Sequence, residues 1–279
     1  MARVLITGGS SFLGQCLVPL AQAEHTVCYT FFSHDPLGMA GGVRVDVREE
    51  TAVVSLIHAF QPDVIIHTVG SNRPDDMSAV IVQGTRHVAL AAARLGVRLV
   101  HISTDAIFDG TAAPYGETAV PTPVNEYGRA KAEAEAIVRR YENHVVVRTS
   151  LIYSLKQMDH GTAWMAAALQ AGEPVTLFAN QVRNPVWVET LSRACLELVG
   201  NGYVGVLNVA GRQVLTRAEF ALRMLDWWGV LERETLVVGM SDARWPLDCR
   251  LDVGRATAVL QTPLWGVDEV LALAAPHSE

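Results

Sequence analysis

Short runs of β-branched and apolar residues alternate with longer stretches of helical periodicity through the first half of the chain. The runs expected to form strands are Val4–Thr7, Val27–Phe31, Val43–Asp46, Val64–His67, Leu99–Ser103 and Val145–Arg148. The stretches expected to form helices lie between them, at Phe12–Ala23, Thr51–Phe60, Ser78–Leu95 and Glu126–Tyr141. Because right-handed crossovers place helices on both faces of a parallel sheet, this alternation predicts an α/β fold with a doubly wound parallel sheet.

After Arg148 the alternation between strand and helix patterns becomes less regular. Helices are expected at Ala163–Ala171, Glu189–Val199 and Thr216–Trp228, and strands at Val175–Phe178 and Val204–Asn208. The pattern predicts a larger sheet domain over residues 1–154 and about 186–211. A smaller C-terminal region is expected over about 155–185 and 212–279, and it crosses back to the sheet domain.

Composition narrows the class of protein. Half of the 279 residues are hydrophobic and 18% are charged, so a sizeable core is expected. The net charge of −7 argues against a nucleic-acid partner. No apolar run approaches the roughly 18 residues of a membrane span, and Val4 already enters a strand, which leaves no room for a signal peptide. A cytoplasmic protein with free cysteines and no metal site is expected, and nothing in the sequence excludes a homodimer.

A glycine-rich turn, Thr7–Gly14, links the first expected strand to the first helix. Gly8 permits a tight turn, and a helix N-terminus offers N–H groups to a pyrophosphate. Ser11 replaces the usual middle glycine, but the position between strand and helix favours a Rossmann dinucleotide site over a plain turn. The cofactor-binding residues expected at this end of the sheet are Gly8, Ser10, Ser11, Phe12, Leu13, Thr68 and Val69.

The second expected strand ends without the carboxylate that NAD-selective sites usually carry. Ser33 and His34 could instead accept a 2′-phosphate, although no arginine stands beside them in the sequence. NADP(H) is therefore favoured, and NAD(H) stays open. Asp46 and Val47 close the third strand and are expected either to meet the adenine or to form an ordinary turn.

The candidate chemistry lies at Thr104, Tyr127 and Lys131. Thr104 ends an apolar strand, and Tyr127 and Lys131 share one face of the next helix. Thr104 is expected to bind a substrate oxygen and Tyr127 to donate a proton, with the Lys131 ammonium favouring the phenolate. Tyr127 and Lys131 are also expected to contact the cofactor. The alternative is a packed threonine, a core tyrosine and a solvated lysine.

Several segments together resemble the dTDP-4-dehydrorhamnose reductase family of extended short-chain dehydrogenase/reductases. They are Thr7–Gly14, Pro62–His67, Ile102–Gly110, Tyr115–Glu117, Tyr127–Lys131, Arg148–Tyr153 and Asn184–Glu189. The resemblance implies that Thr104, Tyr127 and Lys131 are catalytic and that a 4-keto nucleotide sugar is reduced with NADPH or NADH, as in dTDP-rhamnose biosynthesis. The residues expected to face the substrate are Asp105, Ala106, Leu151, Arg183 and Trp187.

The chain departs from this family at the sugar. Ala106 and Leu151 stand where the family usually has two aromatic residues, so either another nucleotide-linked sugar or a different carbonyl compound is expected as the substrate. An epimerase or dehydratase is one alternative, although Ala106 after Asp105 argues against a dehydratase. A non-catalytic NADP-binding partner, like the regulatory subunit of methionine adenosyltransferase, is the other.

Overall fold

The computed structural model describes residues 1–71, 73, 75–242 and 245–274. Its centre is a seven-stranded sheet in the order β11-β6-β5-β4-β1-β2-β3, in which every neighbouring pair is parallel. The predicted doubly wound sheet is confirmed. The strands are β1 (Arg3–Thr7), β2 (Thr26–Phe31), β3 (Gly42–Arg44), β4 (Val64–His67), β5 (Arg98–Thr104), β6 (His144–Thr149) and β11 (Gly205–Asn208).

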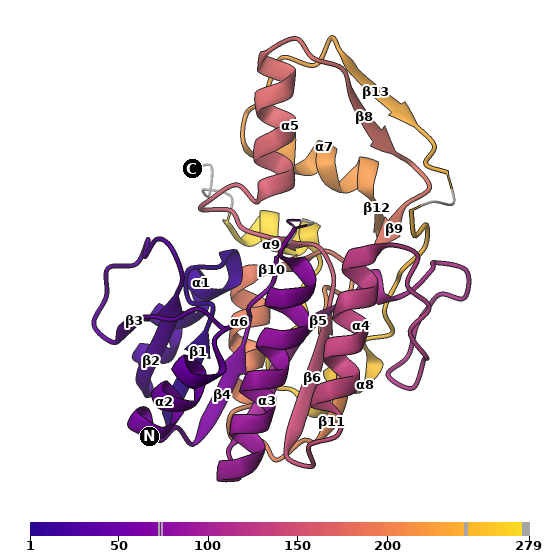
Figure 1. The fold of residues 1–279 in the computed structure, drawn as a ribbon. Helices are drawn as coiled ribbons and strands as arrows, with labels where there is room; N and C mark the ends of the chain where they lie inside the picture. Colours follow the sequence, from indigo (N-terminus) through magenta and orange to yellow (C-terminus); the bar gives the residue numbers. More distant parts are fainter. Residues whose placement is uncertain (72, 74, 243–244, 275–279) are drawn as a thin grey trace.

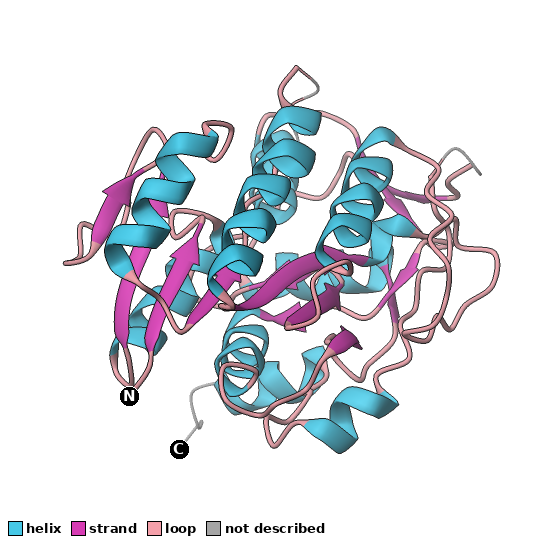
Figure 2. Ribbon diagram, turned by 60° about the horizontal axis from the view of Figure 1, so that its bottom comes forward, coloured by secondary structure: helices cyan, strands magenta, loops and turns pink. Residues whose placement is uncertain are grey.

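Helices cover both faces of this sheet (Figure 2). Side chains alternate across a strand, so Val4 and Ile6 pack on one face and Leu5 on the other. The first face carries α1 (Phe12–Gln22) and α6 (Val188–Glu197), and α8 (Gly254–Val259) contributes Ala256 to the same cluster. The second face carries α2 (Glu50–Phe60), α3 (Gly84–Leu95) and α4 (Glu126–Val138).

Most of the expected helices differ from the sequence prediction at one or both ends, and two of these differences change the local structure. The segment expected as one helix from Ser78 begins as a π-helix, η1 (Ala79–Gln83), which runs directly into α3. Helix α4 ends at Val138 rather than at Tyr141. The Tyr141 hydroxyl donates instead to the carbonyl oxygen of Val97, 2.9 Å away, and ties the end of this segment to the strand β5.

A second group of elements lies together beyond one end of the sheet (Figure 1). It contains α5 (His160–Gln170), β8 (Val175–Phe178), α7 (Arg217–Trp227) and β13 (Leu236–Gly239), packed around its own hydrophobic cluster. The sequence did not anticipate β13, which pairs with β8, or α9 (Val267–Ala274). The crossing segments pair through four two-residue strands, β7 (Ile152–Tyr153), β9 (Val182–Arg183), β10 (Val186–Trp187) and β12 (Leu215–Thr216).

All four cysteines are free thiols. None of the described helices is both long and apolar enough to cross a membrane.

Candidate active site

The turn between β1 and α1 is shaped by Gly8, which has a φ of +83°. A Cβ atom at this position would come within 2.8 Å of the Thr68 hydroxyl, so only glycine fits. Ser11, which replaces the usual middle glycine, is the N-cap of α1 and accepts a hydrogen bond from the Gly14 N–H at 3.0 Å. Thr68 stands behind the turn and donates to the carbonyl oxygens of Thr7 and Gly8 at 2.9 and 3.1 Å. The structure therefore gives Thr68 a supporting role in holding the turn.

A cavity of about 620 Å³ opens from this turn along the ends of β1, β2 and β3. Its volume falls within the usual range of small-molecule and cofactor sites. The sequence-predicted residues that line it are Gly8, Ser10, Ser11, Ser33, Asp46, Val47 and Val69. Phe12 and Leu13 pack instead with the hydrophobic core beneath α1, and the exposed His34 lies outside the lining.

The cavity is also lined by two arginines that were not predicted from the sequence, Arg48 and Arg73. No arginine lies next to Ser33 in the sequence, but in the structure Arg48 and Arg73 line the same cavity as Ser33. The Arg48 guanidinium donates two Nε bonds of 2.9 and 3.0 Å to the Asp46 carboxylate and lies over the Phe32 ring, 5.2 Å from its centroid. This contact holds the pKa of Asp46 below its ordinary value.

Strand β5 and helix α4 bring the three candidate catalytic residues together. Thr104 is the last residue of β5, and its hydroxyl accepts a hydrogen bond from the Ala106 N–H at 3.2 Å. Helix α4 packs so closely on this corner that a Cβ at Gly128 would lie 2.2 Å from the Ala106 carbonyl oxygen. The close approach places the Tyr127 phenol near Thr104 and Asp105, both of which act on its pKa. Lys131 follows one turn later, and its buried ammonium donates to the Ile102 carbonyl oxygen at 2.6 Å.

The electrostatics of the tyrosine differ from the expectation. Burial and the Asp105 carboxylate raise the pKa of Tyr127 to about 12, although the Thr104 hydrogen bond acts in the opposite direction. The Lys131 ammonium is committed to the Ile102 carbonyl rather than to the phenol. Burial lowers the pKa of Lys131 to about 8, partly offset by Glu135. At neutral pH the phenol is therefore protonated and has a proton to donate, but a pKa this far above neutrality makes it a weaker acid than a group with a pKa near 7.

Two buried histidines lie near Lys131. His67 contacts the hydroxyls of Thr7 and Thr85 at 2.6 and 3.0 Å, and both of its ring nitrogens therefore have partners. His101 stacks on it with ring centroids 5.4 Å apart. Within the described part of the chain, neither ring nitrogen of His101 has a hydrogen-bond partner. Burial is the main cause that lowers the pKa of both histidines, and the positive charge of Lys131 lowers it further.

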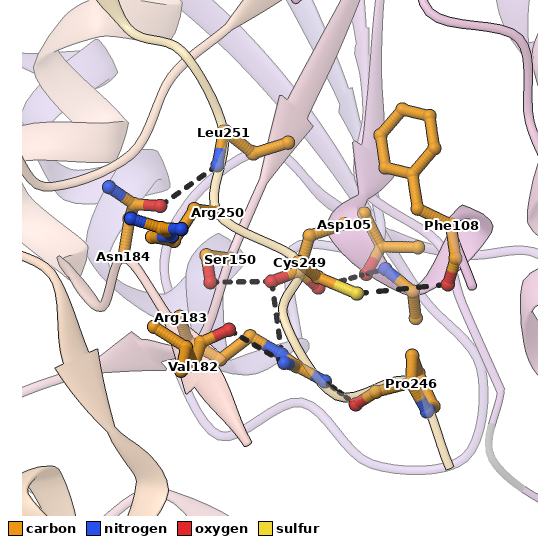
Figure 3. A network of polar contacts seen from close by, with 12 residues as sticks. Asp105, Phe108, Ser150, Val182, Arg183, Asn184, Pro246, Cys249, Arg250 and Leu251 are labelled. Carbon is orange, nitrogen blue, oxygen red and sulfur yellow. Dashed lines mark hydrogen bonds and ion pairs between the residues drawn. The ribbon is translucent and has the colours of Figure 1, made fainter. Parts of the chain in front are cut away.

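Asp105 and Arg183 form the centre of a buried polar network (Figure 3). The Asp105 carboxylate accepts from the Ser150 hydroxyl at 2.6 Å and pairs with the Arg183 Nε at 3.4 Å. The remaining Arg183 bonds go to the carbonyl oxygens of Val182, Pro246 and Leu247 at 2.7 to 2.8 Å. Arg183 thus joins Asp105, at the end of β5, to the C-terminal segment, and its nitrogens are engaged by protein acceptors.

The positions expected to face a sugar are spread over two environments. Ala106 lies half-buried in the short helix η2 (Asp105–Ile107), directly after Thr104. Leu151 and Trp187 are half-buried and pack at the edge of the cluster that contains Tyr153 and Phe220. The exposed Trp164 lies on α5, one turn after His160, which lines the cavity.

Seven parallel strands with helices on both faces and a glycine turn after the first strand make this a Rossmann-like α/β protein. The chain belongs to the RmlD substrate binding domain family, whose model matches residues 2–265.

The relatives carry different activities in their names. The chain is 29% identical over 216 residues to a dTDP-4-keto-6-deoxy-D-glucose reductase of Streptomyces niveus, covering 74% of this chain and 72% of the relative. It is 30% identical over 242 residues to the methionine adenosyltransferase 2 subunit beta of Xenopus laevis, covering 80% and 71%.

Solved structures agree with the fold over almost the whole chain. A hypothetical dTDP-4-dehydrorhamnose reductase from Sulfolobus tokodaii superposes with a TM-score of 0.83 at 27% identity, covering 95% of this chain and 97% of the other. A dTDP-4-dehydrorhamnose reductase of Bacillus anthracis, solved in complex with NADP, gives a TM-score of 0.76 at 24% identity, covering 95% and 94%.

Proposed function

We propose that the protein is an NAD(P)H-dependent reductase of a nucleotide-linked 4-ketosugar. The observation that carries this proposal is that Thr104, Tyr127 and Lys131 lie close together at the end of β5. The ends of β1, β2 and β3, in the same sheet, border the dinucleotide-sized cavity. The names of the reductase relatives support the same reaction class. Residues 1–154 and about 186–211 would bind the dinucleotide, and about 155–185 and 212–279 would bind the substrate.

The cavity fits a dinucleotide cofactor on the protein's own geometry. The Gly8 turn leaves room that a side chain would fill, and Ser11 opens the helix α1 beside it. When bound, NAD(P)H would supply the hydride that the reduction of the substrate carbonyl requires. The chain's own residues complete the reduction to an alcohol: Thr104 orients the carbonyl oxygen, and the protonated Tyr127 phenol donates the proton to that oxygen. Lys131 holds its ammonium below them at the Ile102 carbonyl.

The test is NADPH oxidation in the presence of dTDP-4-keto-6-deoxy sugars and their UDP counterparts. Turnover of at least one ketosugar, with the alcohol as product, supports the proposal. An isomerised or dehydrated product formed without net NADPH consumption would instead support an epimerase or dehydratase.

A non-catalytic partner protein is the second candidate, and the 30% identity to a methionine adenosyltransferase subunit favours it. Co-purification with a methionine adenosyltransferase, together with no turnover of any ketosugar, would support this candidate over the first.

The cofactor cavity leads to a prediction about selectivity. We expect NADPH to bind at least as tightly as NADH, because Ser33 lines the cavity with Arg48 and Arg73, and no carboxylate directly follows β2. Ser33→Asp should weaken NADPH binding about tenfold, since a like charge at ~4 Å costs about 1 kcal/mol in water and a phosphate carries more than one charge. Fluorescence titration measures both cofactors, with the uncharged Ser33→Asn as the control. Wild-type protein that prefers NADH would contradict the prediction.

The buried lysine leads to a prediction about pH. Burial lowers the pKa of Lys131 from 10.5 to about 8, so between these pH values the unfolded chain binds more protons than the folded chain. Stability therefore rises with pH through this window as far as Lys131 contributes. We expect the unfolding free energy of the wild type, relative to Lys131→Met, to increase between about pH 8 and 10.5. Urea titrations at several pH values measure it, with the exposed Lys156→Met as control. A constant difference would contradict the prediction.

A further inference from the structure

His160, the first residue of α5, differs in origin from the other residues that line the cofactor cavity. The rest of the described lining comes from residues 8–80, in the sheet domain, whereas α5 belongs to the second group of elements. Helix α5 begins at the end that faces the central sheet (Figure 1). Among the described residues, His160 is therefore the one through which the second group reaches the cavity.

The backbone of His160 is held by its own helix. The Asp159 carboxylate caps α5, since it accepts from the N–H and the hydroxyl of Thr162 at 3.0 and 2.6 Å. Further along α5, Ala166 and Leu169 are buried in the cluster of the second group. The His160 imidazole is exposed and, within the described residues, makes no hydrogen bond or ion pair. It is therefore available to a ligand in the cavity.

The turn between β1 and α1 has few hydrogen-bond donors left for a diphosphate. The N–H groups of Gly8 and Gly9 donate to the hydroxyl and the carbonyl oxygen of Thr30 at 3.1 and 2.7 Å. Those of Ser11 and Gly14 donate to the Gly8 carbonyl oxygen and the Ser11 hydroxyl at 2.9 and 3.0 Å. The N–H groups of the first two residues of α1 make no hydrogen bond within the described chain. A diphosphate bound to these two donors has further oxygens that face away from the turn.

We propose that the His160 imidazole donates a hydrogen bond to the diphosphate of a bound dinucleotide, so that the cofactor joins α5 to the turn between β1 and α1. This inference rests on the proposed function and deepens it by naming a cofactor-binding residue in the second group of elements. An imidazole has an N–H donor whether the ring is neutral or protonated, and the bond to a phosphate is stronger when the ring is charged. Arg48 of the same cavity is bonded to Asp46 beyond the end of β3, where the adenosine is expected.

The test compares ligands that share parts of the cofactor. NADPH and ADP-ribose 2′-phosphate contain the diphosphate, whereas 2′,5′-ADP does not, and NADH, ADP-ribose and AMP form the second series. We expect calorimetry to show that His160→Ala binds the diphosphate ligands about 3- to 30-fold more weakly, the effect of losing one hydrogen bond to an anion. Binding of 2′,5′-ADP and AMP should be unchanged. His160→Gln keeps an N–H donor and should be intermediate.

His58→Ala is the matched control, because His58 is an exposed histidine of α2 that lies outside the described cavity lining. It should bind every ligand like the wild type. The His160 side chain is exposed and bonded to no described residue, so its variants should melt like the wild type when no ligand is present.

The outcomes distinguish this inference from the proposed function. Equal binding of NADPH and NADH by wild type and His160→Ala would overturn the role of His160, even if a ketosugar is turned over. An equal loss for 2′,5′-ADP or AMP would overturn it too, since His160 would then act on the adenosine end. So would a loss for NADPH and NADH that spares both forms of ADP-ribose, which would place His160 at the nicotinamide. A loss confined to diphosphate ligands, without turnover of any ketosugar, would retain this inference and reject the reductase.

Discussion

Replacing Tyr127 by phenylalanine is expected to lower kcat by about 10²- to 10⁴-fold, the usual effect of losing a general acid. The substitution removes only the hydroxyl, which meets Thr104 at the end of β5. The ring and its packing against the cluster of Met77 and Ile81 stay in place, so folding and NADPH binding should change little. The measurement is single-turnover reduction of a ketosugar, together with an NADPH titration.

Tyr141→Phe is the matched control for this experiment. Its hydroxyl bonds the Val97 carbonyl oxygen, just beyond the far end of α4 from Tyr127. This variant should retain wild-type kcat. Unchanged turnover in Tyr127→Phe would remove the tyrosine from the mechanism, whereas equal losses in both variants would point to a general structural effect.

The second large effect concerns the ion pair between Glu135 of α4 and Arg148 of β6. Both side chains are buried, at 1% and 0% exposure, and the carboxylate accepts bonds of 2.9 to 3.2 Å from the guanidinium. Glu135→Gln leaves a buried guanidinium without its counter-charge, and such a change typically costs about 3–5 kcal/mol of unfolding free energy. We expect a correspondingly lower urea midpoint for this variant.

Two further variants make the experiment specific. Glu133→Gln, also on α4, disrupts the exposed pair with Arg86 at 3.9 Å and should change stability by less than about 1 kcal/mol. The double variant Glu135→Leu, Arg148→Met removes both buried charges and should recover much of the loss, because apolar side chains can replace a buried pair. A loss of similar size in Glu133→Gln, or none in Glu135→Gln, would contradict the expectation.

The sequence was sufficient for the sheet because each strand carries its own signal. Runs such as Val64–Ile66 of β4 are apolar throughout, as expected of strands buried on both faces, and helices with clear periodicity lie between them. The strand β13 gave no such signal, since Val237 and Val238 are exposed and it pairs only with the short β8. Helix α8 is six residues long, too short for a clear periodic pattern.

The candidate site also contains some residues that the sequence predicts and others that it does not. Thr104, Tyr127 and Lys131 follow from local spacing and from the rule that the ends of parallel strands share one edge. Arg48 could have been found by the same rule, because it follows the strand β3 next to β2. His160 belongs to a segment whose approach to the sheet depends on tertiary packing, so no local pattern placed it there. The raised pKa of Tyr127 likewise depends on burial that spacing does not reveal.

The network around Arg183 has a consequence for protein engineering. The Arg183 side chain binds Asp105, which follows the proposed catalytic residue Thr104, and also the carbonyl oxygens of Pro246 and Leu247. A graft that imports the C-terminal segment of a relative to change sugar preference would alter the backbone that Arg183 holds, and through it the setting of Asp105. Segments 181–184 and 246–251 should therefore be exchanged together as one cassette, and a crossover placed between them would disconnect the specificity region from the chemistry it serves.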